Sequence, residues 1–284
     1  MDKAIKKYFP IFALPTAIAF LIFFIVPFIM GAYLSFCKFT TIIDAEFVGF
    51  DNYIKIFSDE TVFKPFVHSL WYTALFAVVS VVLINVLAFI VALLLTKGVR
   101  GTNLFRTVFF MPNLIGGIVL GYIWQLIING VLNKYSLTIV LHEKYGFWGL
   151  IILLCWQQIG YMMIIYIAGI QNVPGDLIEA AKIDGATKWQ TLKNVTIPMV
   201  MPSITICTFL TLTNGFKLFD QNLALTNGEP ARRSEMLAMN IYQTFYDRTG
   251  YEGVGQAEAV IFFILVAVIA MIQLRATRSK EVQQ

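Results

Sequence analysis

The chain has 284 residues, of which 58% are hydrophobic and 13% are charged, and its formal net charge is +4. A soluble domain typically carries about 25% charged and 45–50% apolar residues, so this composition excludes a soluble globular protein. The small positive charge requires no nucleic-acid partner.

Six apolar runs are long enough to cross a bilayer, which takes about 20 mostly apolar residues in a helix. Backbone amides cannot stay unpaired in lipid, so each run is predicted to be helical. The first run is too long for a cleaved signal peptide, lacks a small-x-small cleavage site and is expected to stay as an anchor. The runs cover residues 11–36, 68–95, 105–129, 147–170, 199–225 and 257–274.

Basic residues in short loops favour the cytoplasm, and their distribution predicts the orientation of the chain. With the N-terminus inside, the outer segments hold eight basic residues and the inner segments hold twelve. We therefore predict an all-α membrane protein with six transmembrane helices and both termini in the cytoplasm. The inner basic residues are Lys3, Lys6, Lys7, Lys97, Arg100, Arg106, Lys182, Lys188, Lys193, Arg275, Arg278 and Lys280.

The segments between the runs are too short to form a soluble domain. The longest outer ones, 37–67 and 226–256, have about thirty residues each, below the size at which a core folds alone. They are expected to form short helices and loops on the outer membrane face. The whole chain, 1–284, is predicted to be a single membrane domain.

The inner segment 171–198 is polar although it lies between two apolar runs. Asp176 follows a Pro-Gly turn and is a candidate N-cap for a helix over 177–184. Gly185 is predicted to end that helix, because glycine readily takes a positive φ. A second short helix is predicted over 186–194. A linker that lies flat on the lipid is the alternative, although such helices more often carry bulky apolar residues than paired alanines.

This segment resembles the signature of the permease subunits of ABC importers. That signature consists of EAA, any three residues, G, any nine residues and then I-x-L-P. The chain has Glu179-Ala180-Ala181, then Gly185, then Val195-Thr196-Ile197-Pro198. The resemblance implies a type I importer fold with a core five-helix permease module at 68–275. It also implies that 171–198 is a coupling-helix loop that docks on a cytoplasmic ATPase. The residues implied to couple to the ATPase are Glu179, Ala180, Ala181, Asp184, Gly185 and Pro198.

Other motifs resemble the carbohydrate-uptake branch of these permeases, of the maltose, multiple-sugar and glycerol-3-phosphate type, on the side of the first of two paired subunits. The resemblance implies a sugar or oligosaccharide importer in the bacterial cell membrane. Its partners would be a second homologous permease, two ABC ATPases and an extracytoplasmic sugar-binding protein. The motifs are Phe47-Val-Gly-Phe-Asp-Asn-Tyr53, Arg100-Gly-Thr-Asn-Leu-Phe-Arg106, Phe110-Met-Pro112, Trp124, Leu132-Asn133, Leu225-Thr-Asn-Gly-Glu-Pro230 and Ile241-Tyr242.

The chain lacks the G-x-x-x-x-G-K-[ST] loop that cradles ATP phosphates. ATP and Mg are therefore expected on a separate subunit, and this chain is expected to hold no cofactor and to be no enzyme. His68 and His142 have no metal-ligand spacing around them, so no metal site is expected either.

Polar residues inside membrane helices face the bundle or a cavity, because exposing them to lipid is costly. Amide, hydroxyl and aromatic groups suit a sugar, which offers hydroxyls and stacking faces. Interhelical hydrogen bonding is the alternative role. Lys217 and Asp220, at i,i+3 spacing, are expected to form an ion pair rather than bind ligand. The predicted substrate-binding residues are Asn113, Gln157, Gln158, Tyr161, Thr211 and Asn214.

Two other kinds of transporter fit the sequence less well. An ABC permease for a non-sugar solute, such as a polyamine or a phosphonate, is one alternative. An ion-coupled secondary transporter is another, but it would need intramembrane carboxylates and matching broken helices. Only Asp220 comes close to that requirement.

Overall fold

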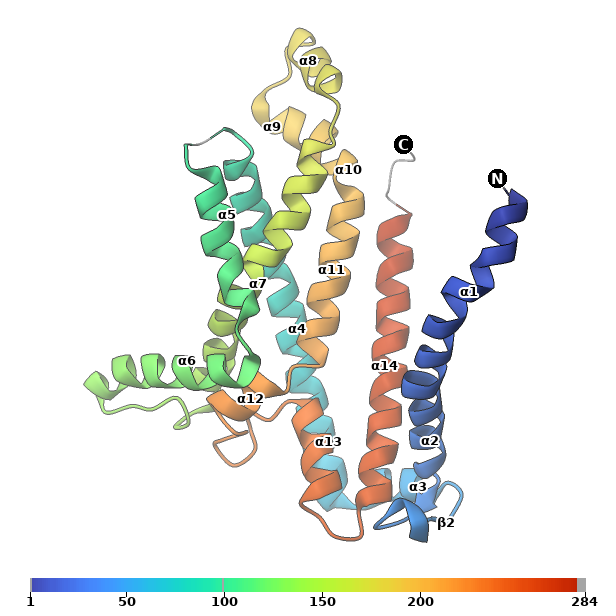
Figure 1. Cartoon of the computed structure of the whole chain (residues 1–284). Helices are drawn as coiled ribbons and strands as arrows, with labels where there is room; N and C mark the ends of the chain where they lie inside the picture. Colours follow the sequence, from blue (N-terminus) through green and yellow to red (C-terminus); the bar gives the residue numbers. More distant parts are fainter. Residues whose placement is uncertain (1, 99, 280–284) are drawn as a thin grey trace. The chain divides into compact units, whose positions relative to one another are not determined.

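The computed structural model describes residues 2–98 and 100–279; Lys280, predicted inside, lies outside the described residues, as do the side chains of Lys3, Lys6 and Lys7. Most of the described chain is helical (Figure 1). The elements are α1 (Asp2–Phe20), η1 (Leu21–Ile25), α2 (Val26–Leu34), β1 (Cys37–Lys38), η2 (Ile42–Asp44), β2 (Glu46–Phe47), α3 (Asp51–Ser58), α4 (Glu60–Leu95), α5 (Thr102–Phe110), η3 (Met111–Leu114), α6 (Gly117–Leu132), η4 (Asn133–Tyr135), α7 (Glu143–Gln171), α8 (Gly175–Ile183), α9 (Lys188–Thr191), η5 (Leu192–Thr196), α10 (Ile197–Met199), α11 (Met201–Phe216), α12 (Asp220–Leu225), α13 (Leu237–Tyr246) and α14 (Glu252–Arg278).

Four of the predicted runs are confirmed as long helices. Among the described residues, Ile11–Leu34, Glu60–Leu95, Glu143–Gln171 and Glu252–Arg278 are long and apolar enough to cross a membrane, and the number rises to six if each of two bent pairs is one span. The chain divides into two compact units. Unit 1 contains residues up to Lys64 and Ile241–Phe263, and unit 2 contains Pro65–Asn240 and residues from Ile264 onward.

Unit 1 contains the predicted outer segment 37–67 up to Lys64. Here β1 and β2 pair antiparallel, and α3 follows them. The buried Asn52 side chain of α3 donates through Nδ2 to the carbonyls of Ser35 and Cys37, at 2.9 and 2.8 Å. Gly253 packs so closely on this turn that a Cβ there would lie 2.3 Å from the carbonyl oxygen of Cys37.

The second predicted run begins early, at Glu60, because Asp59 caps it: the amide of Thr61 donates to Asp59 Oδ1 at 2.9 Å. Hydrogen bonds from Thr61 hold the pKa of the Asp59 carboxyl below its usual value. Pro65 lies inside α4 and has no N–H to offer the Thr61 carbonyl. That carbonyl accepts a hydrogen bond from Arg248 Nη1 instead, at 3.0 Å.

In unit 2, α7 is the most buried long helix. In its most apolar stretch 67% of residues are buried, against 28% in α4. Its core residues, such as Leu150, Leu154 and Met162, join one apolar cluster with residues of α4 and α11. The side of α7 that stays exposed is apolar too, with Trp148, Ile152 and Ile164, so the helix carries no polar stripe along its length.

The third predicted run, 105–129, is not one helix, and that prediction is wrong. α5 continues into η3, which ends at Leu114, and the chain bends by 102° before α6, which lies crosswise to α5 in Figure 1. Pro112 is the second residue of η3. The backbone of Ile115 and Gly116, which follow η3, is extended, with ψ of 130° and 142°. Hydropathy does not register such a break, because the residues around it, apart from Asn113, are apolar or glycine.

The fifth predicted run, 199–225, is also divided. The short helices over Lys188–Met199 meet α11 at 70°, next to Pro202 in the first turn of α11. α11 then ends at Phe216, and α12 begins only at Asp220. The prediction of one continuous helix there is therefore wrong.

A polar network joins α4, α7 and α11 inside unit 2. Tyr166 donates its hydroxyl to Asn85 Oδ1 at 2.6 Å, and Asn85 Nδ2 donates to Thr211 Oγ1 at 2.9 Å. The Thr211 hydroxyl in turn donates to the carbonyl of Cys207 at 2.8 Å. Such bonds hold membrane helices together where no hydrophobic effect drives their association.

Gly160 of α7 allows the closest backbone approach in unit 2. A Cβ built there would lie 1.8 Å from the carbonyl oxygen of Phe109 and 2.7 Å from the amide nitrogen of Phe110. Because both atoms belong to the backbone of α5, no rotamer change can relieve the contact. The spacing between α5 and α7 therefore requires glycine at position 160.

We expect Gly160→Ala to destabilise the folded protein by about 3 kcal/mol, because the added methyl group must push two backbones apart. The measurement is the midpoint of thermal unfolding in detergent. Gly130→Ala is the matched control, since a Cβ at Gly130 meets nothing within 4 Å. Equal midpoints for the two variants would contradict the close approach.

Candidate functional site

A polar cavity of about 280 Å³ lies in unit 2, where α7 faces the two breaks that precede α6 and α12. Four of the six predicted substrate-binding residues, Asn113, Gln157, Gln158 and Asn214, line it. The sequence did not identify Gln221, which completes a set of five amides. The other lining residues are Lys217, Leu218, Phe219 and Asp220.

Hydrogen bonds between the amides fix the walls of this cavity. Gln157 Nε2 donates to the carbonyl of Ile115 at 3.3 Å, and its Oε1 accepts from Gln221 Nε2 at 2.9 Å. Asn214 Nδ2 donates to Gln158 Oε1 at 3.4 Å. Each amide carries two donor hydrogens and an acceptor oxygen with two lone pairs, so these bonds leave capacity for a ligand.

Close packing of α6 on α12 holds one side of the cavity. A Cβ at Gly117 would lie 2.8 Å from Asp220 Cβ, and a Cβ at Gly121 would lie 2.5 Å from Ala224 Cβ. Glycines four residues apart let two helices approach closely in a membrane. One turn further on, Gln125 Nε2 donates to the carbonyl of Leu225 at 2.9 Å.

The other two predicted residues do not line this cavity. Thr211 is completely buried, and its hydroxyl is used in the Asn85 network. Tyr161 packs with its ring centroid 6.4 Å from that of Phe110. The structure thus brings four of the six residues together, places Thr211 in the packing of unit 2 and leaves Tyr161 exposed beside Phe110.

The predicted ion pair between Lys217 and Asp220 is not formed. Among the described side chains, ion pairs join Lys64 to Glu60 and Arg232 to Glu235, and Lys217 belongs to neither. The prediction assumed one helical turn, whereas Lys217 caps the end of α11 and Asp220 starts α12. Both side chains are exposed and line the cavity instead.

The segment 171–198 forms the predicted helix, bend and helix. Gly185 has φ of 75°; its amide donates to the carbonyl of Lys182, and the amide of Ala186 donates to that of Ala181. These two bonds form a Schellman motif, which closes α8. Thr187 then caps α9 through a reciprocal pair of bonds with Gln190.

The predicted cap of α8 is wrong. Pro174 is the N-cap residue and contributes no side-chain bond, while Asp176 lies within the first helical turn. Its carboxylate there still favours the positive end of the helix dipole.

The predicted coupling residues lie on the surface of unit 2, at the end where α7 finishes (Figure 1). Glu179, Ala180, Asp184 and Gly185 are exposed, and Ala181 and Pro198 are half-buried. Apolar side chains are exposed beside them, with Ile183 at 86% and Leu177 at 43%.

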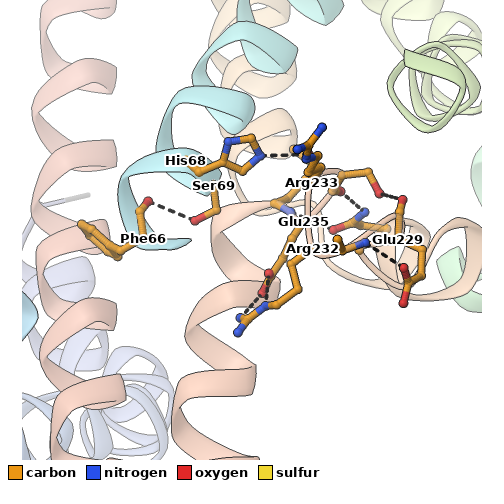
Figure 2. Close-up of polar contacts among 12 residues, drawn as sticks. Phe66, His68, Ser69, Glu229, Arg232, Arg233 and Glu235 are labelled. Carbon is orange, nitrogen blue, oxygen red and sulfur yellow. Dashed lines mark hydrogen bonds and ion pairs between the residues drawn. The ribbon is translucent and has the colours of Figure 1, made fainter. Parts of the chain in front are cut away.

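The loop over 226–236 is more ordered than the sequence indicated. Asn222, which is completely buried, donates through Nδ2 to the carbonyl of Ser234 at 2.8 Å and accepts from the amide of Met236 at 2.9 Å. Figure 2 shows Arg232 paired with the buried Glu235, with Nε–Oε2 and Nη2–Oε1 distances of 2.6 and 2.8 Å. The Leu225-Thr-Asn-Gly-Glu-Pro230 motif marked this loop without revealing its contacts.

The same loop is tied to α4. His68 Nε2 lies 3.0 Å from the carbonyl oxygen of Arg233, as Figure 2 shows, and the amide of Leu237 donates to Thr73 Oγ1 at 2.8 Å. From the sequence, Arg232 and Arg233 are only two of the eight basic residues in the outer segments, and His68 is only a residue without metal-ligand spacing around it. The structure places Arg232 within a folded loop and His68 on α4, against the backbone of that loop.

The fold and this arrangement of helices are those of a transport permease. Residues 84–280 match the family of binding-protein-dependent transport system inner membrane components. The chain belongs to this family, which confirms the resemblance found in the EAA segment. It is a multi-pass membrane component of such a transport system.

Similar proteins cover almost the whole chain. It is 43% identical over 281 residues to the probable starch degradation products transport system permease protein AmyD of Thermoanaerobacterium thermosulfurigenes, covering 96% of this chain and 94% of that protein. It is 29% identical to the multiple sugar-binding transport system permease protein MsmF of Streptococcus mutans serotype c, covering 99% of each.

A solved structure shows the same fold. The match is to a chain of a bacterial ABC transporter involved in the import of the acidic polysaccharide alginate, with a TM-score of 0.80 and 98% of each chain covered. At 20% identity, this likeness concerns the fold alone.

We expect Asn222→Ala to unfold the 226–236 loop. The buried carbonyl of Ser234 and the buried amide of Met236 would each lose their hydrogen-bond partner, at a cost of about 1–3 kcal/mol each. Limited proteolysis should cut the variant within this loop, where the wild type resists. Asn133→Ala, at an exposed position, is the control. Protection of the loop in Asn222→Ala would contradict this role.

Proposed function

We propose that this chain is the transmembrane permease subunit of an ABC importer for a sugar or oligosaccharide. The set of five amides in the cavity carries this proposal. A sugar presents many hydroxyls, each a donor and an acceptor, and an amide side chain complements both. Phe219 adds an aromatic face on which a sugar ring can stack.

The charges of the cavity also favour a neutral solute. One cation, Lys217, and one anion, Asp220, line it. A polyamine would require an excess of carboxylates, and a phosphonate would require an excess of basic groups. The names of AmyD and MsmF, which refer to starch degradation products and to multiple sugars, support the same solute class.

The energy would come from a separate subunit. We propose that two ABC ATPases hold ATP and Mg, that this chain holds no cofactor and catalyses no reaction, and that a second homologous permease completes the pathway. An extracytoplasmic binding protein would deliver the sugar. The surface made by α8 and Gly185 would be the contact through which closure of the ATPases moves the helices.

This function implies an orientation. The loop after α4, the α8–α9 segment and the end of α14 carry Lys97, Lys182, Lys188, Arg275 and Arg278 at one end of unit 2 (Figure 1). Basic residues favour the cytoplasmic side. We therefore propose that this end of unit 2 is cytoplasmic and that the 226–236 loop is outside. We also propose, from the basic residues of the N-terminal segment, that both chain termini are cytoplasmic.

The double variant Gln158→Ala/Asn214→Ala should reduce sugar uptake about tenfold, since each lost hydrogen bond contributes about 0.5–1.5 kcal/mol. The measurement is uptake of labelled malto-oligosaccharides by proteoliposomes holding the complete importer. Asn133→Ala/Gln243→Ala removes two amides that do not line the cavity. Equal uptake by both variants would place the sugar path elsewhere.

Gly185→Pro should abolish uptake while ATP hydrolysis continues without stimulation by the binding protein. Proline fixes φ near −65° and has no N–H, so it cannot replace a residue at φ of 75° whose amide bonds Lys182. Gly175→Pro is the control, because Gly175 is the first residue of α8, where proline is tolerated. Full coupled uptake by Gly185→Pro would show that this segment is not the coupler.

A further inference from the structure

A second cavity in unit 2, of about 500 Å³, lies where the end of α4 meets α8, α9 and η5. Its apolar lining includes Leu93, Ile178, Trp189 and Leu192. It is separate from the amide cavity, with which it shares no lining residue. We call it the basic groove.

Three lysines line this groove, and each comes from a different part of the chain. Lys97 follows α4, Lys182 lies in α8 and Lys188 begins α9, and all three are exposed. The other polar lining residues are Thr191 and Thr196. The groove thus combines an apolar floor with a positive rim and has no carboxylate among its lining residues, which complements an anionic amphiphile.

The position of the groove relative to the apolar span is also informative. Leu93 belongs to the membrane-spanning helix α4, which ends at Leu95, and Lys97 follows two residues later. Trp189 is 68% exposed, and tryptophan favours the level of the lipid headgroups. The groove therefore runs from the depth of the acyl chains to the depth of the headgroups.

We propose that the basic groove binds an anionic phospholipid. The phosphate contacts Lys97, Lys182 and Lys188, and an acyl chain lies along Leu93, Ile178 and Leu192. Basic pockets beside membrane helices bind anionic headgroups in this way. A soluble protein partner would not reach Leu93 at hydrocarbon depth, so the apolar floor favours a lipid over the ATPase. The binding requires neither ATP nor a sugar, so it stands independently of the proposed substrate.

The test uses the intact chain in nanodiscs of phosphatidylcholine with phosphatidylglycerol, and native mass spectrometry to count the phosphatidylglycerol that stays bound. Lys97→Gln/Lys182→Gln/Lys188→Gln should reduce retention about fivefold, since each lysine attracts an anionic lipid. The matched control is Lys193→Gln/Arg275→Gln/Arg278→Gln, which removes equal charge at the same end of unit 2 without touching the groove. Equal loss in both variants, or none in the first, would overturn the proposal.

A second measurement does not depend on the folding of the triple variant. Phosphatidylglycerol brominated on its acyl chains should quench the tryptophan fluorescence of the wild type more than brominated phosphatidylcholine does, and Trp189→Phe should remove this difference. Equal quenching by the two lipids would overturn the proposal. Loss of this difference in quenching on addition of the ATPase subunits would also overturn it, because the ATPase would then occupy the groove.

Discussion

The structure depends on one constraint, that a backbone group freed by a break in a membrane helix must find its partner inside the protein. The chain breaks between Leu114 and Gly117 and again between Phe216 and Asp220. At the first break, Gln157 of α7 donates to the carbonyl of Ile115. At the far end of α12, Gln125 donates to the carbonyl of Leu225. Of these two amides, Gln157 also lines the cavity.

Much of this architecture could be predicted from composition. Four long helices and the helix–bend–helix segment follow from apolar run length and from a glycine at the end of a short helix. The bend at Gly185 was predictable because the Schellman motif is local and needs only residues 181–186. The buried position of α7 was not predicted, although the mean hydropathy of its most apolar stretch, 1.9, is the lowest among the four long helices.

The errors share a physical cause. Hydropathy treats 105–129 and 199–225 as continuous, and it therefore missed the turns at Pro112 and after Phe216. The ion pair predicted for Lys217 and Asp220 failed for the same reason, because i,i+3 spacing brings side chains together only in an unbroken helix. Gln221 and Asn85 were overlooked because their partners lie on other helices, at separations that a single sequence does not reveal.

The crossing at Gly160 has a mechanical consequence for α5 and α7. Side chains that separate most helices can change rotamer and absorb small shifts, but here backbone meets backbone at Phe109. The two helices are therefore stiffly joined at this point and resist any change in their spacing. The extended residues Ile115 and Gly116 are the nearest backbone positions about which α6 can rotate while α5 stays packed against α7.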